Sequence, residues 1–73
     1  MSLDLLKKNQ KAIIVGFNLT DKNLLKRLYD IGLRINGEIM LVKKNKRGAN
    51  IISTNGRIIA LSFEITCKIL VKE

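Results

Sequence analysis

The chain contains no histidine, no proline and no tryptophan, and it has a single cysteine, Cys67. Without histidine, it has no imidazole that could act as an acid–base group or as a metal ligand. One thiol cannot form an internal disulfide, which is typical of proteins from a reducing cytoplasm. One thiol is also too few for a structural zinc site. We therefore expect a cytoplasmic protein that binds no metal.

The usual sequence features of an enzyme are missing as well. The five glycines are scattered and form no Gly-rich loop that could hold phosphate groups. The six carboxylate residues lie far apart in the sequence, so no pair of them indicates acid–base catalysis. The longest apolar runs are four residues, whereas a membrane-spanning helix needs about 20. We expect a protein without catalytic residues, cofactor or membrane span.

Positive charge is the most pronounced feature of the composition. The chain has 14 Lys and Arg against 6 Asp and Glu, for a formal net charge of +8. Such a charge favours an anionic partner, which could be nucleic acid, an anionic membrane surface or an acidic protein face. Charge alone does not choose among these partners, and solubility would also account for it.

The length of 73 residues is enough for one domain, and we expect residues 1–73 to form it. Residues 1–4 are expected to be either a disordered or non-native end, or part of a helical turn laid across the fold. Residues 11–17 are β-branched and predict a strand, with a bulge or sharp corner at Gly16. Further strands are predicted at residues 38–44, 50–54, 57–61 and 69–72.

The clearest predicted helix lies within residues 20–33. Thr20 or Asp21 can cap its start, and Gly32 suits the left-handed position after its end, with Leu33 folding back on Leu28. A further helical turn is predicted at residues 63–68, capped by Ser62. Five short strands, one inserted helix and a helical turn before the last strand predict a mostly β, small barrel.

The helix carries an apolar stripe of Leu24, Leu25, Leu28 and Ile31, which we interpret as core, with a groove for a partner as the alternative. Tyr29 lies at the margin of this stripe, and Arg27 and Arg34 flank it in sequence. Because tyrosine and arginine are enriched in protein interfaces, these three residues form the predicted contact surface. The alternative for Tyr29 is a packing role at the boundary of the core.

Two other features have a functional and a structural interpretation. The hairpin at residues 43–48 is strongly basic, and Lys44 and Arg47 are expected to steer a partner. A charged hairpin tip would also serve simply to prevent edge-to-edge pairing of strands. Cys67 is interpreted as a small buried side chain, with a reactive thiol as the alternative.

Several segments together resemble a known family. The segment Lys26-Arg27-Leu28, followed by Ile31-Gly32-Leu33 and then Gly37, is similar to the R-L-x-x-L-G-(I/L)-x-x-G stretch of FeoA domains. Ile59-Ala60-Leu61-Ser62 resembles their I-A-L strand, and Cys67-Lys68-Ile69-Leu70-Val71 resembles their closing A-x-x-I-x-V. The chain departs from the pattern at Asn36, where proline is frequent, and at Asn9-Gln10, where a glycine-containing turn is usual.

The resemblance implies an SH3-like barrel and a non-enzymatic, cytoplasmic role in ferrous iron uptake. FeoA proteins accompany FeoB, a membrane transporter with a cytosolic GTPase domain. The resemblance implies that this GTPase domain is the partner and that the chain reaches the membrane only through it. It implies no specific nucleic acid partner. The alternative is a basic barrel that binds nucleic acid, or a regulatory module related to the C-terminal domain of iron-dependent repressors.

Overall fold

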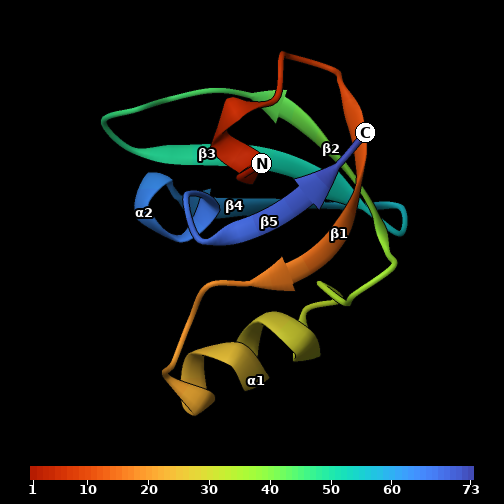
Figure 1. The fold of residues 1–73 in the computed structure, drawn as a ribbon. Helices are drawn as coiled ribbons and strands as arrows, with labels where there is room; N and C mark the ends of the chain where they lie inside the picture. The colour runs from red at the N-terminus through yellow and green to blue at the C-terminus, as the bar shows by residue number, and fades with distance from the viewer.

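The computed structural model covers residues 1–73 and contains three helical segments and five strands (Figure 1). A 3-10 turn η1 (Leu3–Leu5) comes first, and the single long helix α1 (Lys22–Asp30) follows the first strand. The strands are β1 (Lys11–Phe17), β2 (Glu38–Lys43), β3 (Ala49–Thr54), β4 (Arg57–Ser62) and β5 (Ile69–Lys72). The short helix α2 (Phe63–Thr66) joins β4 to β5. The predicted mostly β fold with one inserted helix is confirmed, and individual strand ends differ from the prediction by one residue.

All five strands belong to one antiparallel sheet in the order β4-β3-β2-β1-β5. The outer edge of β5 is covered by the N-terminal arm: Ser2 forms a bridge to Leu70, and the Val71 amide donates to the Met1 carbonyl at 2.7 Å. Residues 1–4 are therefore ordered as an arm and a helical turn. A covered edge matters because an exposed strand edge invites pairing with other chains.

The core lies inside this curled sheet. Its twelve members are apolar: Leu3, Leu6, Ala12, Ile14, Leu28, Leu33, Ile39, Leu41, Ile52, Leu61, Ile69 and Val71. In β2 the residues Ile39–Val42 are all apolar, and the structure places Ile39 and Leu41 inside. The alternation of inward and outward residues follows from the two-residue period of a strand.

The ends of α1 are set by local chemistry, as predicted. The Asp21 carboxylate accepts hydrogen bonds from the amides of Asn23 and Leu24, at 2.9 and 3.2 Å. At the other end Gly32 has φ +103°, and the Leu33 amide donates to the Leu28 carbonyl at 2.9 Å. This is a Schellman stop, and it buries Leu28 and Leu33 in the same core.

Tight turns and a bulge in β1 shape the sheet. Asn55 and Gly56 both have positive φ, at 50° and 76°, and form the tight turn of the hairpin between β3 and β4. The register of β1 against β5 shifts between Ile14 and Gly16, which confirms the bulge. At the positions where the chain departs from the FeoA pattern, Asn9 and Asn36 adopt φ 66° and 71°, a conformation that asparagine tolerates.

Candidate protein interaction surface

An apolar groove lies between the end of β1, α1 and the segment after α1. It is lined by Phe17, Leu25, Tyr29, Arg34 and Ile35, and has a volume of about 440 Å³. Tyr29 and Ile35 are 52% and 57% exposed, so their apolar surfaces are open to solvent. The guanidinium carbon of Arg34 lies 4.2 Å from the centre of the Tyr29 ring. This cation–π contact holds the charge of Arg34 at the rim of the groove. We call this surface the Tyr29 groove.

The Schellman stop of α1 is what brings the two sides of the groove together. After Gly32 the chain reverses, so Arg34 and Ile35 return alongside the last turn of the helix. A second turn then ties this segment to the sheet, because the Asn36 amide donates to the Ile14 carbonyl at 2.8 Å. The groove is therefore supported by backbone hydrogen bonds on both sides. Phe17 and Leu25 in it are half-buried, and Tyr29, Arg34 and Ile35 are exposed.

The structure brings together only some of the residues predicted to contact a partner. Tyr29 and Arg34 are in direct contact. Arg27 is exposed, but it lies two residues before Tyr29, which on a helix places it about 160° away around the axis. Arg27 therefore projects from the opposite flank of α1 and does not line the Tyr29 groove.

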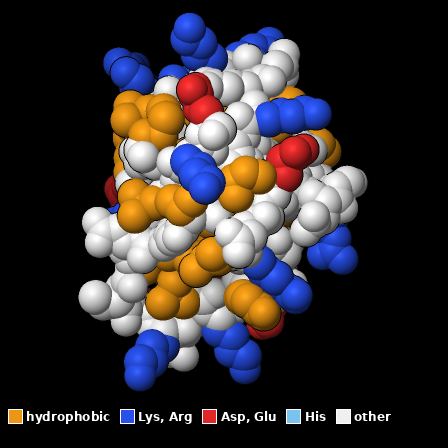
Figure 2. Space-filling model, turned by 45° about the vertical axis from the view of Figure 1, so that its right-hand side comes forward, with side chains coloured by type: hydrophobic (Ala, Val, Ile, Leu, Met, Phe, Trp, Pro, Cys, Tyr) orange, Lys and Arg blue, Asp and Glu red, His pale blue; other side chains and the backbone are white.

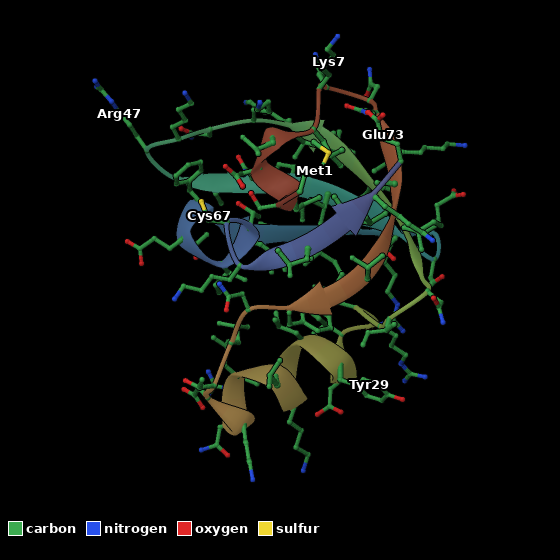
Figure 3. The ribbon with its side chains drawn as sticks, viewed as in Figure 1. Met1, Lys7, Tyr29, Arg47, Cys67 and Glu73 are labelled. Atoms are coloured by element: carbon green, nitrogen blue, oxygen red, sulfur yellow. The ribbon has the colours of Figure 1, made fainter.

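Lys44 and Arg47 lie on the loop between β2 and β3, and both are exposed. Figure 3 shows Arg47 at the tip of this loop, and Tyr29 at the other end of the molecule. The two predicted groups of residues thus belong to separate surfaces.

Phe17, Leu25 and Ile35 were not among the predicted contact residues. Leu25 was interpreted as core, and that interpretation is wrong: it lines the groove, whereas Leu28 is buried and Leu24 and Ile31 pack against the core. The reason is angular, because Leu25 lies about 60° from Leu28 around the helix, toward Tyr29. A helical wheel centred on Leu28 indicates this position of Leu25. The sequence does not indicate that Ile35 lines the groove, because the position of Ile35 depends on the chain reversal after Gly32.

Figure 2 shows several groups of exposed hydrophobic side chains on one face of the molecule, with Lys and Arg side chains mostly toward its margin and one among the hydrophobic groups. Apolar and cationic side chains therefore lie next to each other on this face, as they do in many protein interfaces.

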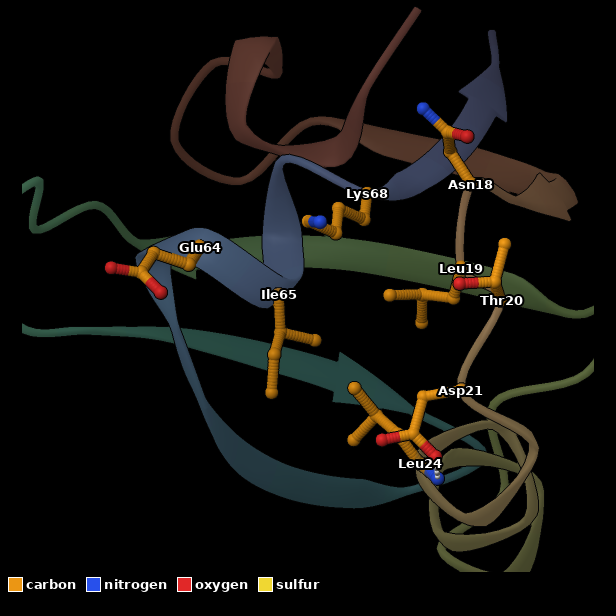
Figure 4. A pocket seen from close by; sticks show the side chains of 8 residues that line it. All are labelled: Asn18, Leu19, Thr20, Asp21, Leu24, Glu64, Ile65 and Lys68. Atoms are coloured by element: carbon orange, nitrogen blue, oxygen red, sulfur yellow. Dashed lines mark hydrogen bonds between the residues drawn. The ribbon is translucent and has the colours of Figure 1, made fainter.

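The largest crevice in the structure is elsewhere, between the β1–α1 loop and α2 (Figure 4). It has a volume of about 490 Å³ and is lined by Asn18, Leu19, Thr20, Asp21, Leu24, Glu64, Ile65 and Lys68. One of its two carboxylates, that of Asp21, is engaged in capping α1. Leu19, Leu24 and Ile65 pack against the core, so this crevice is the seam between two elements.

Cys67 is half-buried beside Asp4. Burial and then the nearby Asp4 carboxylate raise the pKa of the Cys67 thiol, so it is protonated and weakly nucleophilic at neutral pH. No three acidic or cysteine side chains come together in an arrangement that could hold a metal ion. None of the helices is long and apolar enough to cross a membrane.

The fold matches several solved structures. An iron uptake regulatory protein, FeoA, shares 22% identity with a TM-score of 0.85, covering 97% of this chain and 92% of that chain. FeoA of Stenotrophomonas maltophilia, described as a prokaryotic SH3 domain protein complexed with zinc, shares 17% identity with a TM-score of 0.84. That match covers 99% of this chain and 89% of the other. A manganese-dependent transcriptional repressor shares 14% identity with a TM-score of 0.88, and the match covers 96% of this chain but 35% of the repressor.

A search of curated protein sequences found no match. The model of the FeoA domain family, however, matches residues 1–73. The matched region includes every element of the SH3-like barrel and both sides of the Tyr29 groove. The chain therefore belongs to the FeoA family, a family of non-catalytic accessory proteins associated with ferrous iron transport.

Proposed function

We propose that this chain binds the cytosolic GTPase part of a FeoB-type transporter and thereby modulates ferrous iron uptake. The observation that carries the proposal is the Tyr29 groove: an exposed apolar surface with a guanidinium held at its rim, in a member of the FeoA family. Tyrosine and arginine are among the residue types that contribute most to protein–protein affinity. A partner would insert an apolar side chain into the groove and present a carboxylate to Arg34.

The observations favour a protein partner over nucleic acid. A groove for single strands combines several basic residues with aromatic rings that are free to stack on bases. The Tyr29 groove has one cationic residue among its five lining residues, and that residue already covers one face of the Tyr29 ring. Similarity to the repressor concerns the fold of a part of that chain, and it adds no base-reading surface here.

Calorimetric titration of the GTPase part of the FeoB-type protein from the same organism tests the proposal. We expect saturable binding with one chain per GTPase domain in at least one of three states: nucleotide-free, GDP-bound or bound to a GTP analogue. Absence of binding in all three states would contradict it.

The separation of Lys44 and Arg47 from the Tyr29 groove leads to a kinetic prediction. Exposed charges away from the contact act mainly through long-range attraction, which changes the association rate more than the dissociation rate. We therefore expect Lys44→Ala combined with Arg47→Ala to slow association with the GTPase part and to leave dissociation nearly unchanged. Stopped-flow or surface-based kinetics at two salt concentrations would measure this, and an increase confined to the dissociation rate would place the hairpin in direct contact.

A further inference from the structure

One edge of the molecule concentrates positive charge in two segments that are distant in sequence. They are the turn after η1 and the end of β2 with its following loop, and all six of their cationic residues are exposed: Lys7, Lys8, Lys43, Lys44, Lys46 and Arg47. Neither segment contains an acidic residue, and the one carboxylate bonded to them is that of Glu73, which accepts from the Gln10 side chain. We call this surface the basic edge.

Strand pairing is what joins the two segments. Lys11 pairs with Met40, and the Leu41 amide donates to the Gln10 carbonyl at 3.3 Å. The residues just before β1 therefore lie next to the end of β2. Figure 3 shows Lys7 and Arg47 along the same upper side of the molecule, away from Tyr29.

The loop that carries half of the basic edge has a defined shape. The Asn45 amide donates to the side-chain oxygen of the buried Asn50 at 2.7 Å, and the Asn50 amide group donates to Thr66 at 2.9 Å. The Asn45 side chain in turn accepts from the Arg47 amide at 3.0 Å. Because the hydrogen bond to Asn50 holds Asn45 against β3, its cationic neighbours Lys44, Lys46 and Arg47 project into solvent.

The N-terminal segment that carries Lys7 and Lys8 also has exposed apolar side chains. Met1 is 51% and Leu5 is 60% exposed, and Leu5 lies two residues before Lys7. Leu3 and Leu6 are fully buried, so the arm is anchored to the barrel while Met1 and Leu5 remain outside. Leu5 is therefore an exposed apolar side chain two residues from Lys7, and Met1 is a second one on the same arm.

We propose that the basic edge, with Met1 and Leu5, docks on the surface of an anionic phospholipid bilayer. Clusters of four to eight Lys and Arg are attracted to anionic lipid headgroups, and adjacent apolar side chains add affinity by entering the headgroup region. Nucleic acid would gain from the charge but not from exposed aliphatic groups. The one aromatic ring near the basic edge, that of Phe63, is half-buried in a hollow that also contains Glu64.

The docked orientation leaves the other end of the molecule free. With the basic edge on the bilayer, α1 and the Tyr29 groove face away from the lipid (Figure 3). The chain would thus reach the membrane by its own contact, and not only through a protein partner. This proposal stands independently of the GTPase contact, because it is tested in the absence of any transporter.

Co-sedimentation with vesicles tests the proposal. We expect the chain to bind vesicles of mixed phosphatidylglycerol and phosphatidylcholine and not vesicles of phosphatidylcholine alone. The triple variant Lys44→Gln, Lys46→Gln and Arg47→Gln is expected to lower the partition coefficient by about 100-fold, since each cation near an anionic surface contributes roughly five-fold. Leu5→Ser should also lower the partition coefficient, and it should leave the salt dependence of that coefficient unchanged.

The matched control removes the same number of positive charges from exposed positions outside the basic edge: Lys22→Gln, Lys26→Gln and Arg57→Gln. It should retain most of the vesicle binding. Equal losses for the two triple variants would overturn the proposal, because net charge rather than this surface would then be responsible. Absence of vesicle binding, or tight binding to duplex DNA at physiological salt without vesicle binding, would overturn it too. Circular dichroism of each variant verifies that it is folded.

Discussion

Replacement of Leu3 by alanine is expected to lower the free energy of unfolding by about 2–5 kcal/mol, the range for a buried leucine whose cavity cannot collapse. Leu3 is fully buried although it lies near the chain end. It anchors an arm whose backbone also pairs with β5. Because a domain this small is stable by only a few kcal/mol, the substitution should leave a large fraction of the protein unfolded at physiological temperature. Urea denaturation followed by circular dichroism would measure the change.

Leu5 provides the matched control for this prediction. It is the same residue type two positions away, on the same 3-10 turn, but it is 60% exposed. Leu5→Ala is expected to change the free energy of unfolding by less than about 0.5 kcal/mol, as surface substitutions usually do. Equal effects of the two substitutions, or no effect of Leu3→Ala, would mean that the arm is not part of the folded core in solution.

Tyr29→Ala is expected to weaken binding to the GTPase part by about 1–3 kcal/mol, a loss typical of an interface hot spot. The substitution removes both the apolar wall of the groove and the ring against which Arg34 is packed. Arg34→Ala should cause a loss of similar size, and the double variant should lose less than the sum, because the two side chains act as one unit. Calorimetric titration of the three variants would give these affinities.

Two controls make the result specific to the Tyr29 groove. Arg27→Ala, on the opposite flank of α1, is expected to cost less than about 1 kcal/mol of binding free energy, because it lies outside the groove. The half-exposed Tyr29 is not part of the core, so its replacement is expected to leave the domain folded. The thermal midpoint of each variant, compared with that of wild type, checks this. Affinities of the Tyr29 and Arg34 variants equal to that of wild type would show that the partner binds another surface.

Much of the fold could be predicted because its signals are local. Asp21 caps α1, Gly32 and Leu33 end it, and Asn55-Gly56 closes the β3–β4 hairpin through interactions within a few residues. Local backbone chemistry of this kind is the same in a short peptide and in a folded domain, so residue type and order are sufficient to predict it.

Features that depend on contacts between distant segments could not be predicted in the same way. The burial of Leu3 and the order of the N-terminal arm require the edge of β5, which lies about sixty-eight residues away at the Ser2–Leu70 bridge. Which residues of the apolar run in β2 face inward depends on its pairing with β1 and β3. A continuous apolar run is compatible with either side until its neighbours are placed.

The same distinction applies to the candidate surfaces. The charge of the hairpin and the amphipathic character of Tyr29 follow from residue type, so the sequence by itself indicates binding to a macromolecule. Three arrangements follow only from the tertiary structure: Arg34 packs on Tyr29, Arg27 lies on the opposite flank of α1, and Lys7 lies along the same edge as Arg47. The physical reason is that a binding surface is a set of relative positions. Those positions are set by the chain reversal after Gly32 and by the antiparallel register of β1 with β2, not by the identity of the residues themselves.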